Sequence, residues 1–465
     1  MYRKINDPIF GLIELSKVES LIVDTPIFQR LRYIKQLALA NYIYPCANHD
    51  RFSHCLGVFY LTDKICDVLN KKNQNLLDSY SISNLKMAAL LHDLGHSPFS
   101  HALEFYRKKD EFDIKQFPFF FRIPHEEFST YLIKNSYLKD LLLENGYDVN
   151  LICNLIEGND IENLILSRII NWELDSDRLD YILRDSYFTG VGFGNINYHY
   201  LLNSFNCYNN KRIVIDSKAI RDIEHFIISR FSLHDRVYTH KTGSYFTYML
   251  TYSAYYSILN EYFLPFRSKK ELNEIISDKE HSKKFLEFSD FYLFGIFYRI
   301  YQKLKESKRE EDINLSRIFE AVIYRKKNFK IKKYSIFTSK SESETDILKY
   351  RIKNHLDTLI NEYPNEIFVH TPKNVFTKYL STKIPSSGLT NEIEEKFKEE
   401  EEQTIWIQEK DKIPEIFYRT NETFFRKIHD FGITKVLIYI NKENNELIKK
   451  FNSIELKIKK LIYNS

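Results

Sequence analysis

Residues 90–101 read LLHDLGHSPFSH and follow directly on the apolar run Met87–Leu91. This stretch holds three of the 14 histidines of the chain, together with Asp93. The apolar run favours a helix, and at its end the adjacent His92 and Asp93 can offer one imidazole nitrogen and one carboxylate oxygen to the same point. A His-Asp dipeptide alone is weak evidence, because most such pairs are polar residues that face water. The rest of the sequence has to show whether this stretch belongs to a metal site.

The composition favours a mostly helical protein. Glycine and proline are scarce, at 12 and 11 of 465 residues, and Leu, Ile, Lys and Glu are abundant. A chain of this length can bury a large core and is long enough for two domains. The net charge of +4, from 67 basic and 63 acidic residues, is too balanced for a general polyanion binder.

The cysteines and the hydropathy pattern point to a soluble, cytoplasmic protein without membrane contact. The five cysteines form no CxxC pair and their number is odd, so we expect reduced thiols: Cys46, Cys55, Cys66, Cys153 and Cys207. The N-terminal MYRKINDPIFGLIEL contains Asp, Pro and Glu where a signal peptide needs an unbroken apolar core. No run approaches the ~18 apolar residues that a membrane span requires.

The apolar spacing predicts helices along most of the first two thirds of the chain. These predicted helices cover residues 25–41, 56–71, 83–92, 126–134, 161–186 and most of 219–262. Residues 211–216 (KRIVID) alternate in polarity and predict a short strand. We find no internal repeat.

The character of the sequence changes near residue 325. The stretch 325–333 has six basic residues in nine positions and leads into the strand-like SIFT. Further strand-like runs follow between helical segments such as 388–402, at residues 366–370, 404–407 and 435–440. We therefore expect a helical catalytic domain over 1–330 and a smaller α+β lobe over 331–465. The basic stretch is best explained as a solvated strand edge, and a polyphosphate contact is the alternative. The Glu399–Glu402 run is best explained as a solvated helix face or loop.

Three other segments carry residues that suit a metal or phosphate site. RFSHCLGV (51–58) has a histidine at the start of a helix, and PHEEFS (124–129) has another beside two acids. The segment ELDSDRLDYILRD (173–185) spaces its acids so that several fall on one helix face. The order H…HD…D is shared by a group of metal-dependent hydrolases.

Seven segments in this order resemble the HD-domain phosphohydrolases, and more narrowly the deoxynucleoside triphosphate triphosphohydrolases of the SAM-and-HD-domain type. The resemblance covers roughly residues 3–245 and rests on NDPIFGLIEL, DTPIFQRLRYIKQL, RFSHCLGV, LLHDLGHSPFSH, HEEFS, DSDRLDYILRDS and SLHDRVYTHK. Because the match begins by residue 3, the sequence is similar to the shorter, bacterial-type form without a SAM domain.

The resemblance implies a metal held by His54, His92, Asp93 and Asp177. Two imidazole nitrogens and two carboxylates suit Fe, Mn, Zn or Ni, and the sequence does not choose among them. Asp175 and Asp180 compete with Asp177 for the fourth position. We prefer Asp177 because the motif of the family it resembles places the ligand before a basic residue and four positions before a tyrosine.

The implied reaction is hydrolysis of a dNTP at the α-phosphorus, which releases deoxynucleoside and triphosphate. This reaction needs charge neutralisation over three phosphates, with Mg²⁺ accompanying the substrate, and a proton for the departing 5′ oxygen. By the resemblance Arg51 and Arg178 hold phosphate oxygens, Arg230 matches a further phosphate or ribose contact, and His96 touches the α-phosphate. The proton donor is His101 or His125, with Glu126 orienting His125, and the sequence does not decide between these histidines.

The resemblance also implies residues that select a deoxyribose. These substrate contacts are Gln36, Leu37, Tyr181, Asp185, His234 and Tyr238. The aspartate matches one that holds the 3′-hydroxyl, and a tyrosine would pack where a 2′-hydroxyl would clash. The preferred base stays open.

A guanine nucleotide, GTP or dGTP, is the implied activator. The residues that match its site are Asp24, Gln29 and Arg32, whose carboxylate, amide and guanidinium suit the edge of guanine. For the adjoining activator site Lys218, His240 and Lys241 match, but Asp216 stands where an arginine is expected and would repel a triphosphate. Since such sites form where subunits meet, we expect a homo-oligomer, most simply a tetramer.

Two other functions stay open. The first is an HD phosphodiesterase or nucleotidase acting on other nucleotides, which has no evident need for three phosphate-holding arginines. The second is a regulatory protein that binds nucleotides or single-stranded nucleic acid. Such a groove needs basic and aromatic residues interleaved, and FKIKKYSIF (329–337) is only a short instance.

Overall fold

The computed structural model describes residues 3–108, 111–158, 164–338, 342–372, 375–376, 404–410, 412–427 and 432–463. These residues form a mostly helical protein with a few small sheets, which confirms the predicted fold class. The predicted helical segment 388–402 and the Glu399–Glu402 run lie outside the described residues.

The chain folds into two compact units that are interleaved along the sequence. The first unit contains residues 1–230, 264–291 and 382–427, and the second contains 231–263, 292–381 and 428–465. The boundary between the two units is therefore not a single position near residue 330. A regulatory or oligomerisation role for the C-terminal part stays a prediction.

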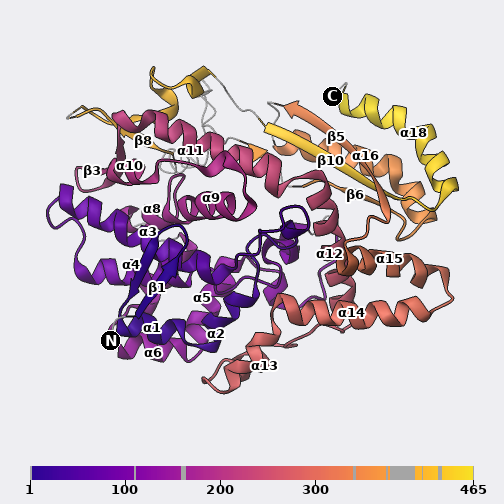
Figure 1. The fold of residues 1–465 in the computed structure, drawn as a ribbon, viewed down its shortest axis with the longest axis horizontal. Helices are drawn as coiled ribbons and strands as arrows, with labels where there is room; N and C mark the ends of the chain where they lie inside the picture. Colours follow the sequence, from indigo (N-terminus) through magenta and orange to yellow (C-terminus); the bar gives the residue numbers. More distant parts are fainter. Residues whose placement is uncertain are drawn as a thin grey trace, which may run out of the picture. The chain divides into compact units, whose positions relative to one another are not determined.

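The first unit is built around helices α3 (Arg51–Lys72), α4 (Ser79–Leu91) and α9 (Ser176–Thr189). Helix α3 packs against both α4 and α9, and the three lie side by side in Figure 1. Each helix begins at an aspartate whose side chain accepts a backbone N–H of the first turn: Asp50, Asp78 and Asp175. The segments predicted to carry metal ligands are thus held at defined helix ends.

The other elements of the first unit surround these three helices. They are β1 (Arg3–Asp7), β2 (Gly11–Leu15), α1 (Lys17–Val23), α2 (Pro26–Gln29), η1 (Arg30–Tyr33), η2 (Ala40–Tyr42), η3 (Ser100–Leu103), η4 (Phe105–Lys108), η5 (Phe119–Phe121), α5 (His125–Asn135), α6 (Leu138–Glu144), α7 (Val149–Glu157), α8 (Leu164–Ile170), η6 (Gly192–Gly194), α10 (Tyr198–Asn203), β3 (Phe205–Tyr208), β4 (Arg212–Asp216), η7 (Ser217–Ala219), α13 (Lys269–Ile275), η9 (His281–Glu287), β8 (Trp406–Gln408), β9 (Glu415–Ile416), η10 (Phe417–Arg419) and η11 (Phe424–Lys427). Strands β1 and β2 form an antiparallel hairpin, and β3, β4, β8 and β9 form a second small sheet in that order. The strand predicted over 211–216 is β4.

Two of the predicted helices are not continuous in the structure. The segment 25–41 folds as α2 and short 3-10 turns, because Lys35 pairs with Asp50 and the N–H of Gln36 donates to the carbonyl of His49. The described part of 161–186 forms two helices, α8 and α9. The break arises because the carboxylate of Asp175 accepts the N–H groups of Trp172 and Arg178 and starts a new helix.

Helices α11 (Ile220–Leu233) and α14 (Asp290–Glu306) run from one unit into the other. The further elements of the second unit are η8 (His234–Tyr238, a π-helical turn), α12 (Lys241–Leu259), α15 (Glu310–Tyr324), β5 (Phe329–Thr338), α16 (Glu342–Glu362), β6 (Ile367–His370), β7 (Val375–Phe376), β10 (Gly432–Asn441) and α18 (Asn445–Tyr463).

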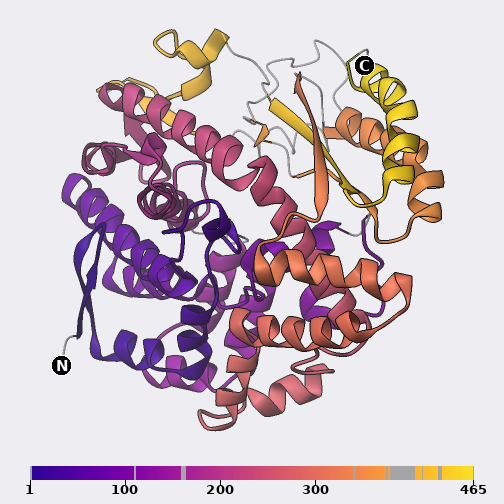
Figure 2. The ribbon, with the colours of Figure 1, turned by 45° about the vertical axis from the view of Figure 1, so that its right-hand side comes forward.

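The sheet of the second unit has β10 between β5 and β6, with antiparallel pairing on both sides. Alternate residues of β10, including Ile438, join a core with α16 and α18, which lie against the sheet in Figure 2. Tyr439 faces the other way and contacts Tyr245 and Tyr248 of α12. Residues 329–333 of the basic stretch already belong to β5, which stands at the edge of this sheet among the described strands, in line with the predicted strand edge.

All five cysteines are free thiols, and only Cys46 is exposed, in agreement with the predicted absence of a disulfide framework. Over the described parts of the chain, none of the helices has both the length and the apolar character that a membrane crossing needs.

Candidate active site

The structure brings the four predicted metal ligands together from three helices. The Nε2 atom of His54 lies 3.0 Å from Asp177 Oδ1 and 3.6 Å from Asp93 Oδ2. The Nε2 atom of His92 lies 3.3 Å from Asp93 Oδ1 and 3.9 Å from Asp177 Oδ1. His54 and Asp93 are buried, while the side chain of Asp177 is 35% exposed. These atoms therefore meet at a partly open point at the ends of α3, α4 and α9.

The hydrogen bonds of the two histidines leave their Nε2 atoms facing the carboxylates. His92 Nδ1 donates to the carbonyl of Ala89 at 2.8 Å, and His54 Nδ1 donates to Asp180 at 2.6 Å. Within the described parts of the chain, the buried His92 Nε2 has no hydrogen-bond partner. Ligand histidines in metal sites are fixed in the same way through their second nitrogen. The donor set thus fits a divalent transition metal.

The carboxylates of this cluster favour positive charge beside them. Burial disfavours a charged His54, but hydrogen bonds to Asp177 and Asp180 outweigh burial and raise its pKa to about 10. Burial likewise opposes ionisation of Asp177, yet His54 and His92 hold its pKa below the usual range. The carboxylates therefore favour a positive charge at this point, which a metal would supply.

Asp180 and Asp175, the competing ligands, are engaged elsewhere. The carboxylate of Asp180 binds His54 Nδ1 and also accepts from Arg184, which in turn donates to Asp7. Gly57 allows this arrangement, because a Cβ there would lie 1.8 Å from Asp180 Oδ1. Asp175 caps α9 and binds the side chain of Arg178.

The loop after His92 is held by α5. Ser129 accepts the N–H of Gly95 at 2.8 Å, and its hydroxyl lies within hydrogen-bond distance of the carbonyls of His92 and His125. Gly95 is required there, because a Cβ would lie 2.2 Å from the carbonyl oxygen of His125. The close approach of α5 explains how His125, distant in sequence, reaches the motif of residues 90–101.

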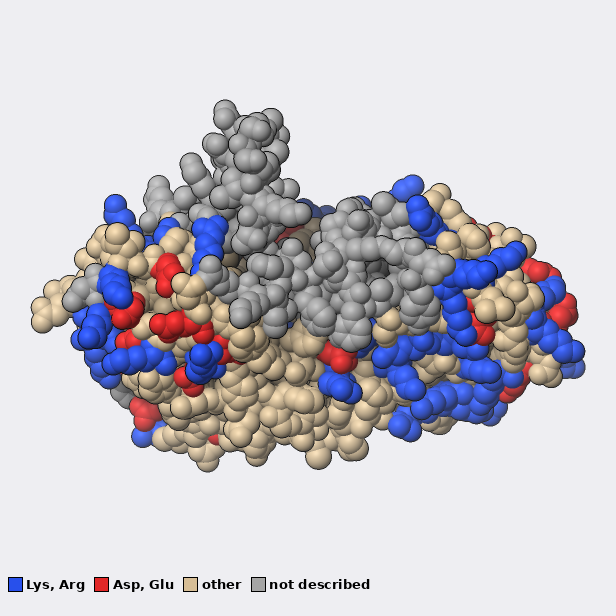
Figure 3. Space-filling view, turned by 90° about the horizontal axis from the view of Figure 1, so that it is seen from above, with Lys and Arg blue, Asp and Glu red and all other residues tan. Residues whose placement is uncertain are grey.

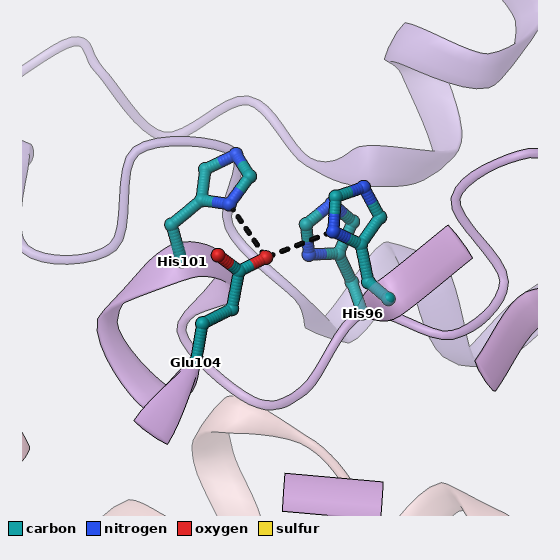
Figure 4. A group of neighbouring side chains, drawn as sticks. His96, His101 and Glu104 are labelled. Carbon is teal, nitrogen blue, oxygen red and sulfur yellow. Dashed lines mark hydrogen bonds and ion pairs between the residues drawn. The ribbon is translucent and has the colours of Figure 1, made fainter. Parts of the chain in front are cut away.

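A second cluster is formed by His96, His101, Glu104 and His125. Figure 4 shows the side chains of His101 and Glu104 pointing toward one another, with His96 beside them. Glu104 Oε1 accepts from the Nδ1 atoms of both His101 and His125 at 2.8 Å. Burial acts to raise the pKa of Glu104, but the two histidines hold it far below the usual range. Sequence reasoning missed Glu104. Its signal was an acid three positions after His101, the spacing at which side chains of one helical turn meet.

The geometry of the second cluster favours proton handling over metal binding. The rings of His96 and His125 stack with centroids 3.8 Å apart and planes only 19° apart. Nitrogen lone pairs of stacked rings point side by side and do not converge on one ion. Burial and the charge of Arg51 lower the pKa of His96, whereas hydrogen bonding to Glu104 overcomes burial and raises the pKa of His125. Glu126 also lies near His125, with its Oε2 3.3 Å from Nδ1.

Asp93 joins the two clusters. Its Oδ1 lies 3.2 Å from His96 Nε2 and 3.8 Å from His125 Nε2. Its Oδ2 accepts from Arg51 at 2.7 Å. Arg51, a predicted phosphate contact, is therefore located at the junction of the two clusters.

The other two predicted phosphate contacts are paired with acids. Arg178 donates to the carbonyl of Trp172 and to Asp175. Arg230 lies 3.8 Å from Glu173, whose carboxylate accepts from the hydroxyl of Tyr418 at 2.5 Å. Both guanidiniums are only partly exposed. A phosphate would have to share them with these carboxylates.

The predicted sugar contacts of the first unit lie around a buried pair that sequence reasoning missed. His49 Nε2 donates to Asp185 Oδ1 at 2.8 Å, and the ring of His49 stacks on Phe188. The backbone N–H of Gln36 donates to the carbonyl of His49, which places the Gln36–Leu37 segment beside this pair. On α9, Tyr181 stands one turn before Asp185, and burial raises the pKa of its hydroxyl to about 12.

The predicted guanine-binding residues are only partly brought together. Arg32 Nε donates to Gln29 Oε1 at 2.8 Å, and its guanidinium lies 3.5 Å from the centroid of Phe52. Asp24 instead binds Arg3 at 2.5 Å. Lys218 is exposed on η7, whose first turn is capped by the Asp216 carboxylate. The acid at 216 therefore has a local structural role.

Four predicted contacts belong to the second unit: His234, Tyr238, His240 and Lys241. His234 and Tyr238 lie on the π-helical turn η8, and His240 caps α12. Burial and the charges of Lys241, Lys435, Lys333 and Lys327 lower the pKa of His240. Figure 3 shows Lys and Arg side chains gathered over the second unit, at the right of the view. Four lysine side chains of this unit therefore lie near enough to His240 to affect its charge, which makes the surroundings of His240 basic.

Comparison with known proteins assigns the fold. Residues 51–184 match the HD domain family. An uncharacterized protein of Mycoplasma pneumoniae is 30% identical over 319 residues, which cover 64% of this chain and 73% of that protein. This chain belongs to the HD domain family. The clusters described above are formed by the motifs of this HD domain.

Two further similarities bear on the HD domain and its surroundings. The human deoxynucleoside triphosphate triphosphohydrolase SAMHD1 is 32% identical over 280 residues, 53% of this chain and 43% of that protein. The chain spans about half the length of this and several other curated relatives. The crystal structure of a phosphohydrolase from Bacteroides thetaiotaomicron has a TM-score of 0.67 at 24% identity, covering 95% of this chain and all of that one. It shows that the fold extends over nearly the whole chain.

Proposed function

We propose that this HD-domain protein is a metal-dependent dNTP triphosphohydrolase. The observation that carries the proposal is the joining of a metal-type cluster and a carboxylate-held histidine cluster through one aspartate, Asp93. Hydrolysis of a phosphate ester needs both charge neutralisation and a proton donor within reach of one phosphorus atom. The similarity to the human triphosphohydrolase supports dNTP as the substrate class.

The metal would be held by His54, His92, Asp93 and Asp177. Fe, Mn, Zn and Ni all suit these donors, and Mg²⁺ would accompany the substrate triphosphate. A bound divalent metal supplies positive charge to the phosphate oxygens and favours deprotonation of water at neutral pH. Asp180 keeps His54 in the tautomer that presents Nε2 to this site.

Phosphate binding falls to Arg51, Arg178 and Arg230, with His96 contacting the α-phosphate. Arg51 is buried beside Asp93, so its charge acts in a low-dielectric environment on the bond that breaks. Arg178 and Arg230 are more exposed and have acidic partners, which keep the guanidiniums in place. We expect them to bind the outer phosphates in both the substrate and the transition state.

We assign proton donation to His101. Its side chain is 57% exposed, whereas that of His125 is 12% exposed and stacks on His96. Glu104 accepts from Nδ1 of His101 and acts to raise the pKa of this imidazole, but burial outweighs the hydrogen bond and lowers the pKa overall. In this assignment Nε2 of His101 gives a proton to the departing 5′ oxygen. The neighbouring His125 is held by the same carboxylate and lies beside Glu126. Its charge would affect the pKa of this donor.

Recognition of the deoxynucleoside would use Gln36, Leu37, Tyr181 and Asp185 of the first unit. His234 and Tyr238 stay substrate contacts predicted from the sequence resemblance. Asp185 is the residue we assign to the 3′-hydroxyl, and Tyr181 to the face of the sugar. A preference among bases is outside this proposal.

Activation by GTP or dGTP would use Asp24, Gln29 and Arg32, with Lys218, His240 and Lys241 at a second nucleotide. The basic surroundings of His240 support a polyanionic ligand, whereas the acid at position 216 disfavours a triphosphate beside Lys218. We propose that the active form is a homotetramer in the cytoplasm. Light scattering across protein concentration, with and without GTP, tests this assembly.

The central experiment identifies products. Metal-free protein is reloaded with Mn²⁺ and incubated with each dNTP, with and without GTP, and the products are separated by anion exchange. Deoxynucleoside with inorganic triphosphate is the expected outcome, and the Asp93→Ala variant is the inactive control. Release of monophosphate or pyrophosphate would instead favour a nucleotidase or phosphodiesterase. Salt-sensitive binding of single-stranded DNA without any hydrolysis would favour the regulatory protein.

A further inference from the structure

A turn with left-handed backbone lies inside the motif of residues 90–101. Phe99 and Ser100 have φ angles of 57° and 54°, a region that non-glycine residues seldom adopt, and here two adopt it in succession. Such conformations persist where the surrounding structure fixes them, and they concentrate at functional sites. The turn immediately precedes His101, the assigned proton donor.

The carboxylate of Asp290 holds this turn. Its Oδ1 accepts the N–H of Phe99 at 2.5 Å, and its Oδ2 accepts the N–H of Lys35 at 2.9 Å. Asp290 is 7% exposed and begins α14, 191 residues beyond Phe99 and 255 beyond Lys35. One buried acid therefore joins two backbone segments that lead directly into predicted site residues, Gln36 and His101.

The connection continues from this turn to the phosphate-binding arginine. The hydroxyl of Ser100 donates to the carbonyl of Lys35 at 2.7 Å and accepts from Nε of Arg51 at 3.0 Å. The other end of the Arg51 guanidinium binds Asp93. The rotation of the guanidinium between Asp93 and Ser100 is thus set by a turn that Asp290 fixes.

We propose that Asp290 is a positioning residue of the active site: by holding the Phe99–Ser100 turn against Lys35, it orients Arg51 toward the phosphates of the substrate. This inference rests on the proposed function of Arg51 as a phosphate contact. Asp290 itself touches neither substrate nor metal in this scheme. Its effect reaches the reaction through Ser100.

The test separates orientation of Arg51 from general stability. Asp290→Asn keeps the size of the side chain but replaces one acceptor oxygen with an N–H₂ group that cannot accept. Ser100→Ala leaves Asp290 and its bonds intact and removes only the connection to Arg51. Glu224→Gln is the matched control, because Glu224 is also a buried acid that accepts a backbone N–H, from Phe424, away from the clusters.

The readouts are the dissociation constant for inorganic triphosphate, measured by calorimetry on the full-length Mn²⁺-loaded protein, its metal content, and KM and kcat for a dNTP. We expect Asp290→Asn and Ser100→Ala each to weaken triphosphate binding and raise KM about tenfold, the effect of ~1.4 kcal/mol, with metal content unchanged. The double variant should be no worse than the weaker-binding single variant, because both changes act on one connection. Glu224→Gln should bind triphosphate like the wild type.

Wild-type triphosphate affinity in Ser100→Ala, or fully additive losses in the double variant, would overturn the inference. If Asp290→Asn does not fold, as judged by circular dichroism, the Ser100→Ala result decides alone. A wild-type protein that binds triphosphate but leaves every dNTP intact contradicts the proposed function while leaving this inference standing. A wild-type protein that does not bind triphosphate at all overturns this inference, whereas the proposed function is decided by the products formed from dNTPs.

Discussion

Replacing Gly57 with alanine should damage both the stability and the metal site of this protein. Gly57 lies in the interior of α3, where alanine is ordinarily preferred to glycine by ~1 kcal/mol. At this position a Cβ would lie 1.8 Å from Asp180 Oδ1 and 2.5 Å from Arg184 Nη2. The carboxylate of Asp180 and the guanidinium of Arg184 must therefore move, although both are fully buried.

The size of the effect follows from the bonds that are displaced. Asp180 accepts from His54 at 2.6 Å and from Arg184 at 2.8 Å. Breaking a buried, hydrogen-bonded ion pair costs about 3–5 kcal/mol, and the helix preference of alanine returns about 1 kcal/mol. The free energy of unfolding should then fall by roughly 2–4 kcal/mol. Because His54 loses the bond that fixes its tautomer, metal affinity should fall about 10–100-fold as well.

The assay is thermal unfolding followed by circular dichroism, together with metal analysis after dialysis against a weak chelator. Gly295→Ala is the matched control, because Gly295 is exposed in α14 with no atom within 4 Å of a new Cβ. The control should be unchanged or stabilised by up to about 1 kcal/mol. A Gly57→Ala protein that unfolds like the wild type and keeps its metal would refute the role of Gly57 as the space for Asp180.

Four further outcomes are expected. Asp93→Ala should remove metal and hydrolysis together while the helical circular dichroism spectrum persists; turnover by the metal-free variant would contradict the ligand set. His101→Asn should lower kcat by about 10²–10⁴ with little change in KM. Arg178→Ala should instead raise KM by about one to two decades, because a charged hydrogen bond worth ~1.5–3 kcal/mol is lost. Steady-state kinetics distinguishes the two effects. Burial raises the pKa of Asp290 to about 7, although backbone N–H groups and the charges of Lys35 and Arg30 act to lower it. The folded state therefore keeps a proton that the unfolded state loses, and the contribution of Asp290 to the free energy of unfolding should decline as the pH rises from about 4 to about 7. Urea unfolding across this range should show this contribution as a decline in the wild type relative to Asp290→Asn. Arg32→Ala should abolish any increase in light scattering that GTP produces in the wild type, and an unchanged increase would remove Arg32 from the activator site.

The sequence by itself determined the fold class and the short-range parts of the site. Helical class follows from composition and apolar spacing, which are local properties that each helix carries in its own residues. His92 and Asp93 were recognised because adjacent residues at a helix end keep their proximity in any fold. The pairing of His54 with Asp177 needed the order of several motifs, since 123 residues separate them in the sequence.

Only the tertiary structure decided how backbone groups and supporting side chains are used. The helix predicted over 25–41 is broken because Lys35 finds its partners in Asp50 and in Asp290, a bond that spans 255 residues. His49 and Glu104 gave no strong sequence signal, because their roles depend on Asp185 and His125 arriving from other helices. A left-handed turn at Phe99–Ser100 is likewise invisible in local propensity, since it is imposed by a distant carboxylate. Periodicity records which face of an element is apolar, but the hydrogen bonds that orient a site are formed only when remote segments meet.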